Sequence, residues 1–404
     1  MLHATESSVG QLPPKVSFPV LATHSLGIPV YIYAVSVASL LTVVGIIWDI
    51  SWHTSIGRDG LLSPPHLLVY MGAILGGLFS GVQVFINSFT QKGAPHNTLI
   101  KVWGIFYASL GGMVCIWGAL AMLTSAPFDD WWHNTYGLDV TILSPPHSLL
   151  ALGMLFLQFG ACISVSKYLR HHTEAGGVPT RLHTRLRWLF IMAASSLLTM
   201  LLTLASEYLD TRNQRTGLFY AISIPLCLLF FPALARALGT RWAATHIAFG
   251  YFFILAVCNW VLQIFPATPK LGPIYHHVTH FQPLMFPVLL MMPALVWDVV
   301  HNKLSKPLAQ AGFGTLGFGL VLLVVQFSIS GFLLQSPHAR NWFFGSHSWY
   351  FGSDPTWEYR YRFAPWELDT LPQLGVGVAL GLILGFGASL LSLRWGRWLK
   401  SVRR

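Results

Sequence analysis

Residues 28–50 of this chain read IPVYIYAVSVASLLTVVGIIWDI, and the only charged side chain among them is Asp49. A run of about 20 apolar residues is long enough for an α-helix to cross the hydrocarbon core of a bilayer. Further runs of this kind follow in a chain that is 54% hydrophobic and 9% charged, whereas soluble domains carry about 25% charged residues. The sequence therefore predicts an all-α, polytopic membrane helix bundle.

The apolar runs predict about ten transmembrane helices joined mostly by short loops. The expected spans are 28–50, 66–89, 102–124, 146–169, 186–208, 217–238, 244–265, 281–300, 313–334 and 372–394. We divide the chain into an N-terminal segment, a region with two repeated motifs, and a region of further helices with a long loop at 335–371. The boundaries of these three parts are 1–27, 28–170 and 171–404.

Lysine and arginine predict the orientation of the bundle, because they are enriched in cytoplasmic loops of membrane proteins. An even number of spans places both termini on one side, and most of the 24 basic residues fall on that side. The other side holds only Arg58, Arg212, Arg215, Lys270, Arg340, Arg360 and Arg362. We therefore expect both termini to be cytoplasmic in a bacterial-type inner (plasma) membrane. The lipid bilayer is the expected partner, and no basic stripe interleaved with aromatic residues indicates nucleic-acid binding.

Two segments on the expected periplasmic side repeat one pattern. They read WDISWHTSIGRDGLLSPPH at 48–66 and FDDWWHNTYGLDVTILSPPH at 128–147. In each, an aspartate precedes a histidine by four residues, so the two side chains share one helix face. The Ser-Pro-Pro-His that follows is typical of a helix start, with serine as N-cap and proline in the first turn. Each second histidine should therefore lie at the start of the next span.

Each copy can bring one carboxylate and two imidazoles to one point, a donor set that suits copper, iron or zinc. The alternative is an ordinary hydrogen-bonded pair that only holds helices together. Ionisable groups near a membrane are costly and usually functional, and their recurrence favours metal binding. The predicted metal ligands are Asp49, His53 and His66 in one set, and Asp129, His133 and His147 in the other.

The first segment resembles a metal-binding segment in one membrane subunit of the copper membrane monooxygenases, the particulate methane and ammonia monooxygenases. The residues that carry the resemblance are Asp49, His53, Arg58, Asp59, Ser63, Pro64 and His66. The second segment resembles the other copper motif of that same family through Asp129, His133, Pro145 and His147, with Asp129 where the family has asparagine. The resemblance covers roughly residues 45–150 and indicates a distant relative. It implies copper in both sets, with Arg58 and Asp59 as a pair that supports the first.

A third group of polar residues lies in the C-terminal half on the same side. Glu207 ends the fifth span, and the sequence YHHVTH places three histidines before the eighth. Glu207, His276, His277 and His280 could form an additional metal site or orient the other ligands. The alternative is an interfacial polar loop without a ligand.

Two functions remain open from the sequence. The first is a membrane-bound, copper-binding monooxygenase-like protein that oxidises a small or lipophilic substrate with O₂. Its electrons would come from quinol or another donor, and it would work with partner subunits or as a homo-oligomer. The second is a non-catalytic metal-binding membrane protein, such as a copper or zinc carrier or an accessory subunit. Catalytic residues beyond the ligands are unknown, and no Walker A, HExxH or GxSxG motif indicates ATP-driven transport or hydrolysis.

Overall fold

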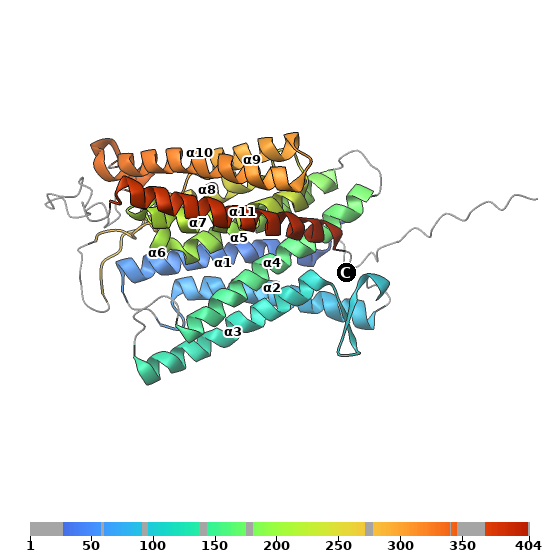
Figure 1. Ribbon diagram of the computed structural model, residues 1–404. Helices are drawn as coiled ribbons and strands as arrows, with labels where there is room; N and C mark the ends of the chain where they lie inside the picture. Colours follow the sequence, from blue (N-terminus) through green and yellow to red (C-terminus); the bar gives the residue numbers. More distant parts are fainter. Residues whose placement is uncertain are drawn as a thin grey trace, which may run out of the picture.

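The computed structural model describes residues 27–57, 60–90, 96–137, 144–174, 181–270, 278–339, 341–345 and 368–402. These residues form a bundle of long helices that run roughly parallel or antiparallel to one another (Figure 1). The long helices are α1 (Val30–Ser55), α2 (Pro64–Phe89), α3 (Leu110–Tyr136), α4 (Pro145–Glu174), α5 (Arg181–Leu204), α7 (Gly217–Leu238), α8 (Ala243–Leu262), α10 (Pro307–Gln335) and α11 (Leu371–Ser401).

Shorter elements connect these helices. The helices among them are α6 (Ser206–Leu209), α9 (Met291–Lys303), η2 (His96–Thr98), η3 (Asn213–Arg215), η4 (Pro337–Ala339) and η5 (Trp342–Phe344). Strands β1 (Ile100–Val102) and β2 (Phe106–Ala108) form an antiparallel hairpin before α3, in which Lys101 pairs with Tyr107. In the part of the chain that the structure describes, nine helices are long and apolar enough to cross a membrane. The predicted all-α, polytopic fold is confirmed.

The expected span at 281–300 is a continuous helix only from Met291 onwards, and residues 281–290 have no regular secondary structure. Pro283 and Pro287 favour a break in this stretch. Proline has no N–H to donate to a helix, and it drives the preceding residue towards extended backbone. Hydropathy alone does not detect this break, because the stretch remains apolar.

Side chains from neighbouring helices hydrogen-bond the non-helical backbone. The amide of Val288 donates to Tyr251 Oη (3.0 Å), and the amide of Leu289 donates to Gln326 Oε1 (2.9 Å). Asn259 bonds two further groups, since its Nδ2 donates to the carbonyl of Met285 and its Oδ1 accepts from the amide of Leu284. Irregular backbone is tolerated at membrane depth only where protein or water satisfies its polar groups. These contacts explain how the extended stretch lies inside an apolar bundle.

The segment 278–303 runs from one end of the bundle to the other. At its start, Gln282 bonds Ser51 and Ser55 near the end of α1. At its end, Asp298 accepts hydrogen bonds from the amides of Ala244 and Thr245 at the start of α8. The segment therefore provides a tenth passage, half extended and half helical, in addition to the nine long helices.

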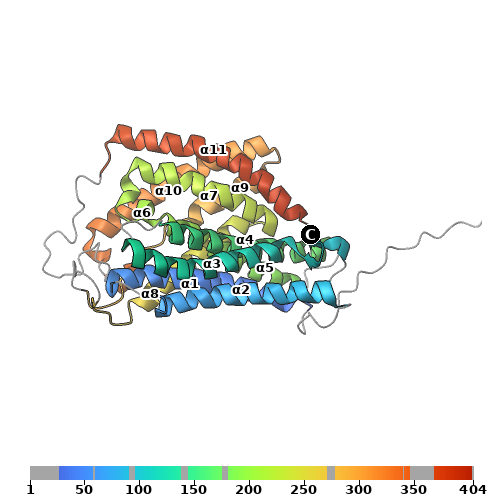
Figure 2. The ribbon, with the colours of Figure 1, turned by 90° about the horizontal axis from the view of Figure 1, so that it is seen from below.

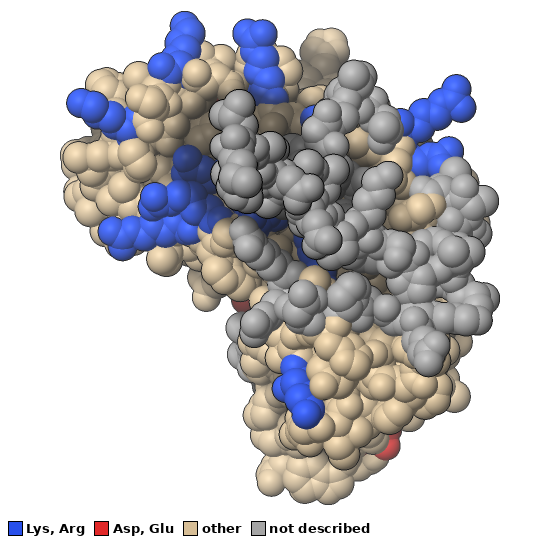
Figure 3. Space-filling view, turned by 90° about the vertical axis from the view of Figure 1, so that its right-hand side faces the viewer, with Lys and Arg blue, Asp and Glu red and all other residues tan. Residues whose placement is uncertain are grey.

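The start of α1 and the end of α11 lie at the same end of the bundle (Figure 2). Both contact the end of α4: the rings of Tyr31 and Tyr168 are 6.3 Å apart, and Ser166 Oγ donates to Leu399 O. Viewed from this end, the surface carries many lysines and arginines and few acids (Figure 3). This asymmetry is the one that the positive-inside rule associates with the cytoplasmic side.

Glycine allows α3 and α4 to pack very closely. A Cβ at Gly118 of α3 would lie 2.5 Å from the amide nitrogen of Leu157 and 2.7 Å from the carbonyl oxygen of Gly153, both on α4. Such distances leave no room for a side chain, so the two helix backbones touch directly. The close approach matters for function, because the second aspartate–histidine set joins the end of α3 to the start of α4.

Candidate metal centre

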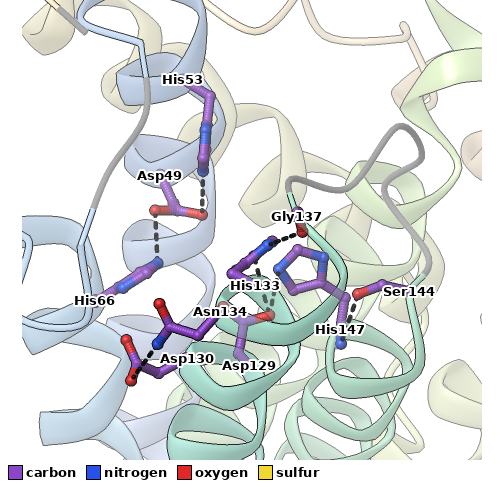
Figure 4. A network of polar contacts seen from close by, with 10 residues as sticks. All are labelled: Asp49, His53, His66, Asp129, Asp130, His133, Asn134, Gly137, Ser144 and His147. Atoms are coloured by element: carbon purple, nitrogen blue, oxygen red, sulfur yellow. Dashed lines mark hydrogen bonds and ion pairs between the residues drawn. The ribbon is translucent and has the colours of Figure 1, made fainter. Parts of the chain in front are cut away.

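The two repeated motifs occupy equivalent places in the bundle. Asp49 and His53 lie on the last turns of α1, and His66 is the third residue of α2. Asp129 and His133 lie on the last turns of α3, and His147 is the third residue of α4. Both sets lie at the end of the bundle opposite the basic surface (Figures 1 and 4).

The helix starts follow the sequence prediction with one difference. Ser144 caps α4, since its Oγ accepts from the amide of His147 (3.4 Å). Ser63 occupies the N-cap position of α2 without a capping side-chain hydrogen bond. Both second histidines nevertheless lie in the first turn of their helices, as the Ser-Pro-Pro-His pattern predicts.

Asp129, His133 and His147 converge on one point. His133 Nε2 lies 3.5 Å and His147 Nε2 3.3 Å from Asp129 Oδ1. One ligand atom from each of the three residues lies within 4.8 Å of the other two, and all three side chains are partly buried. Within the described residues, this is the group of three that can hold a metal ion.

The backbone fixes the orientation of one imidazole in this set. His133 Nδ1 lies 3.1 Å from the carbonyl oxygen of Gly137, to which it can only donate (Figure 4). In the neutral ring, Nε2 then carries a lone pair that faces a carboxylate oxygen. A metal ion between these two acceptor atoms would relieve the repulsion between them. The donor set therefore fits a transition metal, with Gly137 O in the role of the outer hydrogen-bond partner that orients a ligating histidine.

The first set is more open than the second. Figure 4 shows the Asp49 carboxylate between the two imidazoles, with His53 Nε2 3.8 Å from Oδ2 and His66 Nε2 3.3 Å from Oδ1. The two histidines approach different oxygens, and the set does not bring one atom from each residue within 4.8 Å of the others. Among the described residues, Asp49 Oδ1 is sealed from solvent and accepts no hydrogen bond of normal geometry. A small movement of His53, whose side chain is 49% exposed, would be needed for all three groups to bind one ion.

The other predicted residues are placed as follows. Arg58, Asp59, His276 and His277 lie outside the described residues. Glu207 is exposed on α6, and His280 Nδ1 lies 2.9 Å from Thr279 Oγ1. Neither of these two joins a group of three ligands in the described ranges. The third metal site stays a prediction.

Two features near the sets were not predicted from the sequence. Asn134 Nδ2 donates to Asp130 Oδ2 (3.3 Å) beside the second set (Figure 4). Asp130 and Asn134 are four residues apart, one position after Asp129 and His133, so their contact could have been predicted from the sequence. The second feature is the contact of Gln282 with Ser51 and Ser55, for which no local pattern exists because the bonded residues are 231 and 227 positions apart.

The comparisons with known proteins give no family for this chain. No family model matches it, and no curated protein or solved structure does so either. The fold and the site define a polytopic helical membrane protein with a histidine and aspartate group that can hold a metal ion.

Proposed function

We propose that this chain is a copper-binding, monooxygenase-like membrane protein that oxidises a small or lipophilic substrate with O₂. The observation that carries the proposal is the convergence of Asp129, His133 and His147, whose ligand atoms lie within 4.8 Å of one another. The copper assignment rests on the resemblance of both motifs to the copper membrane monooxygenases. By donor chemistry alone, iron and zinc fit the same set.

The residues of the chain have distinct tasks in this proposal. Asp129, His133 and His147 hold one copper ion, and Asp49, His53 and His66 hold a second. Bound copper supplies the redox chemistry that O₂ activation requires. Gly137 O keeps His133 in the tautomer that can bind the ion. The carboxylate of Asp129 adds a negative charge where the resembling family has asparagine, which strengthens binding of a divalent ion.

The position of the sets determines the expected route of the substrate. They lie at the end of the bundle away from the basic surface, so in a bacterial-type inner membrane they face the periplasm. A lipophilic substrate reaches this end through the bilayer, and a small polar one reaches it from water. Electrons come from quinol or another donor, and partner subunits or further copies of the chain complete the assembly.

One observation favours a second function. The side chains of His53 and His147 are 49% and 34% exposed. Ligands open to water exchange their metal readily, as a copper or zinc carrier or an accessory subunit requires. We keep this non-catalytic role as the alternative.

Metal content tests the proposal. The protein in nanodiscs is loaded with copper, washed and measured by ICP-MS, beside His133→Ala and His147→Ala. Asp130→Asn serves as the matched control, because it removes the neighbouring exposed carboxylate and leaves all three ligands in place. We expect one to two copper ions per wild-type chain, loss of about one in both ligand variants, and no loss in the control.

The outcomes separate the functions. Copper together with O₂-dependent oxidation supports the monooxygenase, whereas copper that exchanges freely without O₂ consumption supports the carrier. If iron or zinc binds in place of copper, the metal site stands and the copper assignment is lost. If no metal binds above background, the aspartate–histidine sets have a structural role only.

A further inference from the structure

Two hydroxyl groups of α1 bond the main chain of one residue in the segment 278–303. Ser51 Oγ donates to the carbonyl oxygen of Gln282 (2.6 Å), and the amide of Gln282 donates to Ser55 Oγ (2.8 Å). The two serines are one helical turn apart, and Ser55 Oγ also donates to Ser51 O. All three residues are buried, with at most 1% exposure. The contact therefore satisfies both backbone polar groups of Gln282 inside protein, where water cannot replace them.

These serines lie behind the first set of ligands. Ser51 follows Asp49 by two residues, and Ser55 follows His53 by two residues. At 3.6 residues per turn, a separation of two places side chains on nearly opposite faces of a helix. Gln282 therefore contacts one face of these two helical turns, and Asp49 and His53 lie on the opposite face.

Further contacts extend this attachment along the end of α1. The rings of Trp52 and Phe281 are 6.0 Å apart, and the amide of Lys270 donates to the carbonyl oxygen of Ile56 (2.9 Å). The last turn of a helix frays when its carbonyl groups lack partners. Lys270 supplies such a partner at Ile56, and Phe281 of the segment packs against Trp52 beside His53.

In the part of the chain that the structure describes, the second set has no such support at the equivalent positions. The residues two after Asp129 and two after His133 are Trp131 and Thr135, and both are exposed. The hydroxyl of Thr135 bonds its own helix at Trp131 O (2.8 Å). The second set depends instead on the close packing of α3 against α4.

We propose that residues 278–282 act as a strap that positions the Asp49, His53 and His66 set, with Ser51, Ser55 and Gln282 as its positioning residues. The inference rests on the proposed metal binding and adds a role for the C-terminal half of the chain. Because the first set is open, its affinity depends on how firmly α1 is held. Loss of residues that orient metal ligands typically costs 10- to 100-fold in affinity.

A copper titration with the first set isolated tests this role. The background protein carries His133→Ala and Asp129→Asn, so that only the Asp49 set remains. Into it we introduce Ser51→Ala with Ser55→Ala, and measure the Cu²⁺ dissociation constant in nanodiscs. We expect binding about 10- to 100-fold weaker, restored by Ser51→Thr with Ser55→Thr, which returns both hydroxyls.

Thr54→Ala is the matched control, because its hydroxyl lies on the same turn and, among the described residues, bonds its own helix at Ile50 O and Ser51 O. The control should bind copper as the background protein does. A second pair of proteins, with the Asp49 set removed by Asp49→Asn and His53→Ala, reports whether the serine changes also weaken the Asp129 set.

Three results would refute the proposed positioning role of residues 278–282. Unchanged affinity in the double alanine variant removes the positioning role. An equal loss at both sets, with a lower melting temperature, indicates general destabilisation instead. Absence of copper binding in the background protein with both serines intact refutes the proposed function at the Asp49 set, and the strap with it.

Discussion

Asn259→Ala tests how the membrane-buried, non-helical segment is held in place. Asn259 lies on α8 and is 5% exposed. Its side chain bonds the carbonyl of Met285 and the amide of Leu284. Alanine removes both bonds and leaves the carbonyl of Met285 and the amide of Leu284 without these partners at a buried position.

The expected loss of stability follows from the two main-chain groups that lose their hydrogen-bond partner. A buried polar group left without a partner costs about 1–3 kcal/mol, so the variant should lose about 2–6 kcal/mol in free energy of unfolding. A lower bound for this loss comes from hydrogen bonds between membrane helices. These contribute on average about 0.6 kcal/mol, because the groups find other partners in the unfolded state. A loss of about 2 kcal/mol or more would therefore show that the segment lacks alternative partners.

Reversible unfolding in mixed micelles, with metal removed by a chelator, measures this difference. Asn302→Ala is the matched control, because Asn302 Nδ2 also donates to a backbone carbonyl, that of Arg241 (2.7 Å), but at an exposed site where water can replace it. We expect the control to lose less than about 1 kcal/mol. Equal losses in the two variants would refute the account of how residues 281–290 are stabilised.

Two further predictions concern the helix ends and the helix packing. Asp298 accepts hydrogen bonds from the amides of Ala244 and Thr245 and from the hydroxyl of Thr245. Asp298→Ala removes all three and should lower the free energy of unfolding by about 1.5–3 kcal/mol in the same assay. A loss no larger than that of exposed Asp130→Ala would contradict the capping role. Gly118→Ala places a Cβ 2.5 Å from the Leu157 amide and should cost about 1–3 kcal/mol while weakening copper binding at the Asp129 set. Its control is Gly81→Ala, where a Cβ meets nothing within 4 Å; similar effects of the two alanines would show that α3 and α4 do not need their close contact.

Local features of the fold and site could be predicted from the sequence. Apolar runs of span length predict membrane helices because backbone groups in lipid must bond within their own helix. The spacing of four between Asp129 and His133, and the Ser-Pro-Pro before His147, predict one helix face and one helix start. The structure has both features, since each depends on residues only a few positions apart.

The break at 281–290 could not be predicted from hydropathy, although Pro283 and Pro287 were visible in the sequence. Proline occurs within transmembrane helices when neighbours satisfy the freed backbone groups, as in α7, which remains a helix through Pro225 and Pro232. Whether a helix continues or opens therefore depends on its surroundings. Around 281–290, side chains of α8 and α10 supply hydrogen bonds to extended backbone.

The sequence by itself determined that this protein lies in a membrane, which donor residues it carries, and at which helix ends they lie. Tertiary structure decided which donors converge. The Asp129 set brings its ligand atoms within 4.8 Å of one another where α3 packs against α4, whereas the Asp49 set is open and its helix contacts Gln282, 231 positions from Ser51. Hydrophobicity and helical spacing are properties of neighbouring residues, but convergence of ligands depends on distances between helices that only packing sets.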